Sequence, residues 1–139
     1  MTQISFELDN IKVDPEGMNI DEKYKALINI DANLTLRFDD DIVFAENFNF
    51  LELLASLKRW ERLDFSGLFS FESFDFDDEG IFEFIPVENG FVFSSCWAVS
   101  TTDVTLSLGE VTDFVFSFDQ VCRASVQAEL GINIERFSL

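Results

Sequence analysis

The chain has 139 residues, a length that fits one domain, and we expect a single domain spanning residues 1–139. Hydrophobic residues make up 47% of the chain and 18 residues are Phe, which excludes a disordered acidic tail because such tails are poor in aromatic residues. Nine Lys and Arg against 27 Asp and Glu give a formal net charge of −18, and a field of this sign disfavours binding to nucleic acid or to an anionic membrane.

The first third of the chain predicts three strands. Residues 4–13 alternate loosely between apolar and polar side chains, and this first strand ends at the turn-forming residues 14–17. Every second residue from Tyr24 to Phe38 is apolar, which predicts one long strand with a single buried face. Residues 39–41 are three Asp residues that turn the chain into a short strand over residues 42–46.

A helix is predicted over residues 49–62. Its apolar residues follow helical spacing and include Trp60 at the end of the stripe, so we expect Trp60 to be buried against a sheet. Asn49 and Glu52 have the spacing of a capping box at the start of this helix. Basic residues follow at the end, which the helix dipole favours.

Four further strands are predicted over residues 68–76, 81–87, 91–99 and 104–106. The Asn89-Gly90 pair is a strong hairpin signal between the second and third of them. On the third strand, alternate residues from Phe91 to Val99 are predicted to share one face. We expect the four strands to form an antiparallel meander.

A second helix is predicted over residues 108–130. Apolar side chains recur there at helical period, although many are β-formers by type, and packing of an amphipathic face supplies most helical stability. Ser107 and Glu110 form a capping-box pair, and Gly131 suits the position after the helix end. The fold class is therefore α+β, in the order β-β-β-α-β-β-β-β-α, with two helices packed on antiparallel sheet.

The sequence lacks the side chains that most catalytic mechanisms require. There is no His, which removes the His-based nucleophilic and acid–base sites and nearly all zinc sites. The two cysteines, Cys96 and Cys122, lie in apolar stretches and are predicted to be buried small hydrophobes. We therefore expect no enzyme, no metal and no cofactor; a carboxylate-only glycosidase and a calcium loop at residues 75–80 are the weaker alternatives.

The distribution of charge is more informative than any motif. Residues 63–122 contain no Lys or Arg, and seven of the nine basic residues precede this block. We expect a partner to bind the acidic meander, around a turn at residues 77–80 that should project from the sheet. The alternative is that these carboxylates only protect a strand edge or keep the protein dissolved. The predicted partner-binding residues are Glu72, Asp75, Asp77, Asp78, Glu79, Glu83 and Glu88.

Several short runs over residues 40–137 resemble the layout of small bacterial proteins. They are Phe44-Ala45-Glu46, Leu51-Glu52-Leu53-Leu54, Leu57-Lys58-Arg59-Trp60, Phe93-Ser94-Ser95-Cys96-Trp97 and Ser107-Leu108-Gly109-Glu110-Val111. In size and acidity the chain resembles immunity proteins of bacterial toxin systems, including contact-dependent growth inhibition, and its element order is similar to the Whirly-like fold among them. The resemblance carries over no functional residue.

This resemblance implies a cytoplasmic immunity protein that binds and neutralises a cognate toxin, expected to be a basic nuclease-type domain. An acidic partner gains association rate and specificity at such a cationic surface. The alternatives are an acidic nucleic-acid mimic or regulator of a host protein, and a carrier that holds a hydrophobic ligand among its Phe residues. The sequence begins without the pattern of a signal peptide, and we expect a monomer or weak dimer.

Overall fold

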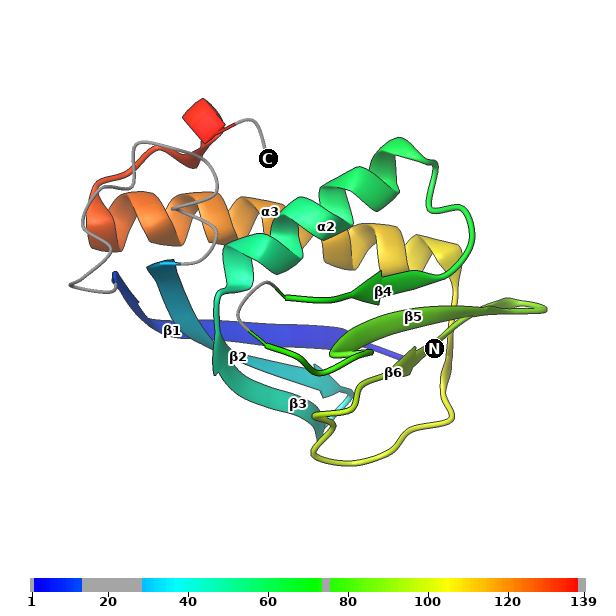
Figure 1. Ribbon diagram of the computed structural model, residues 1–139. Coiled ribbons are helices and arrows are strands. Elements are labelled where there is room, and N and C mark those ends of the chain that lie inside the picture. The colour runs from blue at the N-terminus through cyan, green and yellow to red at the C-terminus, as the bar shows by residue number, and fades with distance from the viewer. Residues whose placement is uncertain (1, 14–28, 74–75, 138–139) are drawn as a thin grey trace.

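The computed structural model describes residues 2–13, 29–73 and 76–137, with side chains described as far as residue 135. It contains two antiparallel sheets with strand orders β1-β2-β3 and β4-β5-β6-β7, which we call sheet A and sheet B. Both helices, α2 and α3, lie on the same side of the sheets, and α3 contacts strands of each sheet (Figure 1). The α+β fold and the predicted order of elements are confirmed.

The strands and helices have the following bounds. Sheet A consists of β1 (Ile4–Val13), β2 (Ile30–Phe38) and β3 (Asp41–Phe48). Sheet B consists of β4 (Phe69–Phe71), β5 (Phe82–Val87), β6 (Gly90–Ser94) and β7 (Thr105–Leu106). The helices are α2 (Phe50–Arg62), α3 (Leu108–Leu130) and the 3-10 helix η1 (Ile134–Phe137).

Sheet A follows the alternation seen in the sequence. All five apolar positions of β2 from Ile30 to Phe38 are buried, whereas the intervening polar residues are half-buried. The predicted strand over residues 24–38 is confirmed from Ile30 onward; residues 24–28 lie outside the described part. The turn is formed by Asp39 and Asp40, because Asp41 already pairs with Phe38.

Sheet B is the predicted meander; β5 and β7 each begin one residue later than predicted, and the other two strands are shorter by several residues. The strand predicted over residues 68–76 spans only Phe69–Phe71, because Ser73 turns inward to bond side chains at the start of α2. The strand predicted over residues 91–99 ends at Ser94. There the Ser95 hydroxyl donates a hydrogen bond to the Ile81 carbonyl (2.5 Å), and the chain leaves the ladder.

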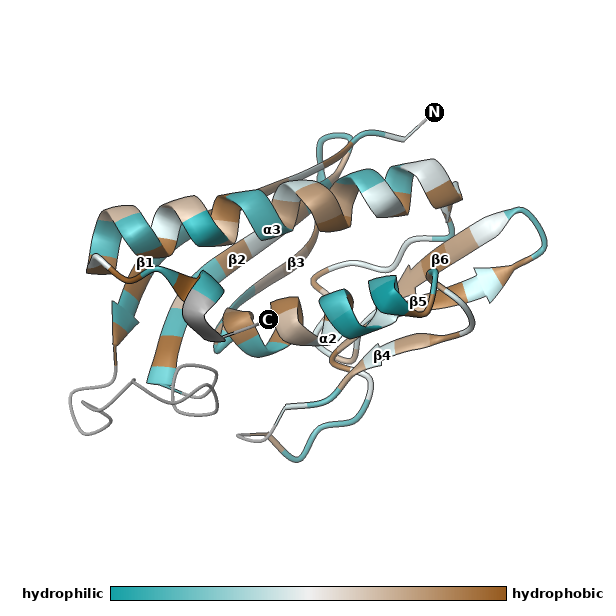
Figure 2. Cartoon of the chain, turned by 90° about the horizontal axis from the view of Figure 1, so that it is seen from above, coloured by the Kyte–Doolittle hydropathy of each residue, from teal (hydrophilic) through white to brown (hydrophobic). Residues whose placement is uncertain are grey.

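The core between helices and sheets is built largely from aromatic side chains. Trp60 is 4% exposed, as predicted, and its ring contacts Phe65, Phe69, Phe84 and Phe91 at centroid distances of 5.1–5.9 Å. Its indole N–H donates to the Ser66 carbonyl (3.2 Å). Figure 2 shows hydrophobic residues, in brown, recurring along both helices. The Phe114 ring of α3 contacts Phe82 and Phe84 of sheet B and Phe6 of sheet A, so α3 packs on both sheets.

The two helices have different caps. The capping box at α3 is confirmed: the Ser107 hydroxyl accepts from the Glu110 amide and the Glu110 carboxylate accepts from the Ser107 amide, while Gly131 is left-handed (φ 66°). The capping box predicted for α2 is wrong. The Asn49 side chain does not accept from the helix backbone but donates to the Glu52 carboxylate, and both residues are buried.

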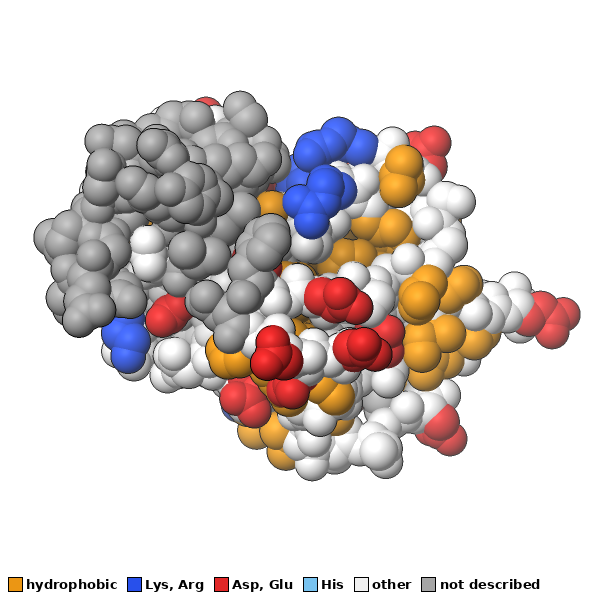
Figure 3. Space-filling view, in the orientation of Figure 1, with side chains coloured by type: hydrophobic (Ala, Val, Ile, Leu, Met, Phe, Trp, Pro, Cys, Tyr) orange, Lys and Arg blue, Asp and Glu red, His pale blue; other side chains and the backbone are white. Residues whose placement is uncertain are grey.

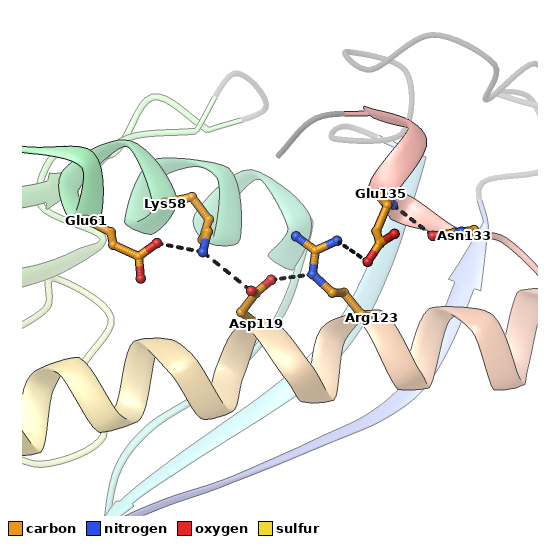
Figure 4. A network of polar contacts seen from close by, with 6 residues as sticks. All are labelled: Lys58, Glu61, Asp119, Arg123, Asn133 and Glu135. Carbon is orange, nitrogen blue, oxygen red and sulfur yellow. Dashed lines mark hydrogen bonds and ion pairs between the residues drawn. The ribbon is translucent and has the colours of Figure 1, made fainter.

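An ion-pair network holds α2 to α3 (Figure 4). Lys58 contacts Glu61 (2.6 Å) on its own helix and Asp119 (3.4 Å) on α3. Asp119 also accepts from Arg123 (2.8 Å), which reaches Glu135 in η1 (3.8 Å). The hydrogen bond to Glu61 raises the pKa of Lys58 above its ordinary value, burial opposes the rise, and the Asp119 carboxylate adds to it.

Candidate partner-binding surface

The segment that joins β4 to β5 presents most of the predicted site residues to solvent. Glu72, Asp77, Asp78 and Glu79 are all exposed, and Asp75 lies outside the described residues. Figure 3 shows acidic side chains gathered on one face over this segment, with basic side chains above them near the end of α2. We call residues 76–80 the acidic loop.

The acidic loop is fastened to the segment that follows β6. The Phe76 ring packs edge-on against the Trp97 ring at a centroid distance of 5.0 Å. The Trp97 indole donates to the Asp78 carboxylate (2.5 Å), and the Cys96 amide donates to the Gly80 carbonyl (2.9 Å). Three contacts therefore hold a loop of five residues, so its carboxylates are presented from a defined backbone.

Trp97 itself rests on sheet A. Its ring lies 6.4 Å from the ring of Phe44 and 6.2 Å from that of Phe48, both on β3. Its amide donates to the Ser95 hydroxyl (3.0 Å), the group that also bonds Ile81. This position differs from the sequence prediction, in which Trp97 shared a strand face with Phe91; because β6 ends early, Trp97 connects the acidic loop to the other sheet.

The two remaining site residues lie apart from each other. Glu83 is half-buried on β5, and its carboxylate lies near Gly80 at the end of the acidic loop. Glu88 lies in the β5–β6 turn, five residues further on, which at strand spacing is roughly 17 Å away. The structure thus brings Glu83 to the acidic loop and leaves Glu88 at the far end of the hairpin.

None of these carboxylates is in an ion pair within the described part of the chain. The ion pairs there use Glu7, Glu61, Asp119 and Glu135. Neighbouring carboxylates without cations repel one another and keep a negative potential at the surface. A cationic partner would relieve that repulsion.

The exposure of Cys96 shows that its predicted burial is wrong. Cys122 is buried as expected, but Cys96 is exposed, because the strand that would have buried it ends at Ser94. Partial desolvation, followed by the charges of Asp78 and Glu83, raises the pKa of the Cys96 thiol. A raised pKa lowers the thiolate fraction, which argues against a nucleophilic role.

A buried polar cluster supports the start of the acidic segment, and sequence reasoning missed it. Glu52 is 4% exposed, and its carboxylate accepts hydrogen bonds from Asn49 and from the Ser73 hydroxyl (3.0 Å). The cluster joins the first turn of α2 to the chain just after β4. Its sequence signal is the Asn49–Glu52 spacing, which a helix capping box shares.

Two recesses, of about 440 and 500 Å³, lie between β1 and α3. The recess of about 440 Å³ is lined by Phe6 and Phe114 together with Glu110 and Asp113. Within the described residues, Glu110 Oε2 is buried there without a hydrogen-bond partner. The recess has acidic as well as aromatic walls, so it differs from the Phe-lined cavity expected of a hydrophobic carrier.

Metal ligands do not gather anywhere in residues 2–13, 29–73 and 76–137. No group of three or more His, Cys, Asp or Glu side chains lies there in an arrangement that could hold a metal ion. None of the helices in this part of the chain is long and apolar enough to cross a membrane.

Comparison with known proteins places the chain in a family. Residues 4–131 match the sequence profile of a domain of unknown function, DUF7878, and the chain belongs to that family. No curated protein and no solved structure matches the chain.

Proposed function

We propose that this member of the DUF7878 family is an inhibitory binding protein of the immunity type, which neutralises a basic, nuclease-type toxin by covering its cationic surface. The observation that carries the proposal is a set of exposed carboxylates, without ion pairs to any described residue, that are presented from a loop fixed by Trp97. They lie within a stretch of sixty residues, 63–122, that has no Lys or Arg.

Charge is the first support for this function. A nuclease binds phosphates through cationic groups, and a protein of net charge −18 is attracted to the same groups. Complementary charge raises the association rate and disfavours wrong partners. Rapid capture is what an inhibitor needs when the target is harmful while free.

Preorganisation of the acidic loop is the second support. A loop that must become ordered on binding loses conformational entropy, and this loss weakens the complex. The acidic loop already has its Trp97, Phe76 and Cys96 contacts in the unbound chain. Its carboxylates can therefore meet a cationic surface with little further ordering.

The test is identification of the partner followed by kinetics. The chain is immobilised, and proteins retained from a lysate of the native host at low salt are identified by mass spectrometry. The retained protein is then purified, and its enzymatic activity and its association rate are measured with the chain present. We expect a basic protein whose nuclease activity falls to zero at a stoichiometric amount of chain, and an association rate that falls steeply with salt.

Three results would count against the proposal. A retained protein of acidic or neutral surface would remove its electrostatic basis. Full activity of the retained enzyme in the complex would remove the inhibitory role. A retained host DNA-binding protein with no toxic activity would favour the alternative, an acidic nucleic-acid mimic.

A further inference from the structure

The outer face of sheet B carries an apolar row across neighbouring strands. Ile85 on β5 pairs with Val92 on β6, and Val92 pairs with Thr105 on β7. Leu68 immediately precedes β4, whose ladder with β5 begins at Phe69 and Phe84. We call Leu68, Ile85, Val87 and Val92 the apolar row.

Three members of this row are exposed to solvent and Val92 is half-buried, whereas the opposite face of the same strands is covered. Along β5 and β6 the rings of Phe82, Phe84, Phe91 and Phe93 are buried on the helix side. Leu68 is 55% exposed, Ile85 38% and Val87 42%. Figure 3 shows hydrophobic side chains over the β5–β6 hairpin, beside the acidic group.

Carboxylates flank the row at both ends. Glu83 lies two residues before Ile85 on the same face of β5, next to the acidic loop. Glu88 lies in the turn directly after Val87. An apolar centre with a charged rim is the anatomy of a protein-binding surface, in which buried apolar anchors supply most of the binding energy.

The negative charge around the apolar row indicates which kind of molecule can bind it. A second copy of this chain would place the same carboxylates against this face. Each copy has a net charge of −18, so the two copies would repel each other. A cationic protein surface instead meets Glu83 and Glu88 with opposite charge. An apolar side chain between its Lys and Arg residues would contact the row.

We infer that the outer face of sheet B is the docking face for the basic partner, with Ile85 and Val92 as its apolar anchor and the acidic loop as its charged rim; this inference rests on the proposed function. Charge then governs how fast the partner arrives, and the apolar row governs how long it stays.

The experiment uses two synthetic peptide probes of equal length and charge. One alternates Lys with Leu and the other alternates Lys with Ser, and each carries a fluorophore for anisotropy titrations at low salt. The variants are Ile85→Thr and, as matched control, Ile42→Thr. Ile42 is an isoleucine on β3 of sheet A with 37% exposure, so both substitutions remove a similar apolar surface from a strand. Thr keeps the β-branch at both sites.

We expect the Lys–Leu peptide to bind about tenfold more tightly than the Lys–Ser peptide, since one side chain's burial is worth about one factor of ten or more. Ile85→Thr should reduce that ratio to near one, and Ile42→Thr should leave it unchanged. Circular dichroism melts confirm that each variant is folded, and Val92→Thr provides a second test of the row.

The remaining outcomes separate the inference from the proposed function. If both peptides bind equally and binding depends only on Asp77 and Glu79, the basic partner stands and the apolar anchor is wrong. If neither cationic peptide binds at low salt, the proposed function fails as well. If light scattering shows a dimer that Ile85→Thr dissociates, the occupant is a second copy and the inference is overturned.

Discussion

The solvent-facing sides of the two sheets carry different kinds of side chain. On sheet A, Glu7 pairs with Arg37 (2.8 Å) and Asn47 donates to Asn33 (2.7 Å), so polar groups satisfy one another across the strands. On sheet B, Ile85 pairs with Val92, and the nearby Glu83 has no ion pair within the described residues.

The difference shows that a solvent-facing sheet in this chain does not need exposed apolar side chains. Sheet A shows that this chain can cover a sheet face with paired polar side chains. An apolar row flanked by carboxylates that have no ion pair among the described residues is therefore a departure that solvation alone does not require. The departure also follows the sequence, since the bases on sheet A precede residue 63 and sheet B lies in the base-free block.

The largest expected effect concerns the inner face of sheet B. Trp60→Ala should lower the free energy of unfolding by about 3–5 kcal/mol, because the ring fills the space between α2 and three Phe residues of the sheet. The measurement is chemical denaturation followed by circular dichroism. Phe116→Ala on α3 is the control; this ring is 60% exposed, and its loss should change stability by less than about 1 kcal/mol. Equal effects would mean that Trp60 does not anchor sheet B.

A smaller effect is expected where β6 meets β7. Gly90 has φ 151°, and a Cβ there would lie 2.0 Å from the Leu106 carbonyl oxygen. Gly90→Ala should therefore lower stability by about 2 kcal/mol or more, because the backbone of one strand must move.

Gly131→Ala is the matched control for Gly90. Its φ is 66°, and a Cβ at this residue would meet no atom within 4 Å, so only backbone strain of about 1 kcal/mol is expected. Thermal melts of both variants give the comparison. A Gly90→Ala variant as stable as Gly131→Ala would show that β7 is held loosely.

Charge reversal should affect binding more than folding. Asp77→Lys with Glu79→Lys should change stability by less than about 0.5 kcal/mol per site, because both residues are exposed. Association with the basic partner should become slower and less dependent on salt. Asp78 is left unchanged because it accepts the Trp97 indole hydrogen bond, so reversing it would test the loop's anchor instead. An unchanged association rate in stopped-flow experiments would place the site elsewhere.

On sheet A we expect a small effect on stability and none on binding. Arg37→Gln removes the ion pair with Glu7, and it should cost no more than about 1 kcal/mol because exposed ion pairs contribute little. It should also leave partner binding unchanged. A loss of binding with intact stability would move the docking face to sheet A.

Much of this fold could be predicted from side-chain periodicity. The α3 boundaries and its two caps agree with the sequence prediction, because the apolar period, the Ser107–Glu110 pair and Gly131 all indicate the same helix. β1 likewise has the predicted bounds. Local signals suffice where several of them agree.

The predictions that were wrong share one cause, which is tertiary contact between residues far apart in the sequence. β6 ends early because Ser95 bonds Ile81, fourteen residues away, and this single contact exposes Cys96 and moves Trp97 toward β3. Asn49 fails to cap α2 because Glu52 and Ser73 provide a buried alternative. For the proposed site, the sequence gives the number of carboxylates, but the pairing of Ile85 with Val92 follows only from strand register.

The most direct test of the docking face is methyl NMR of the chain bound to its basic partner. The reporters are the Ile85 and Val92 methyl groups on sheet B, and those of Thr35 and Ala45, which pair with each other on sheet A. We predict that adding the partner shifts or broadens the Ile85 and Val92 signals and leaves Thr35 and Ala45 unchanged. Perturbation of Thr35 and Ala45, with Ile85 and Val92 unaffected, would contradict a docking face on sheet B.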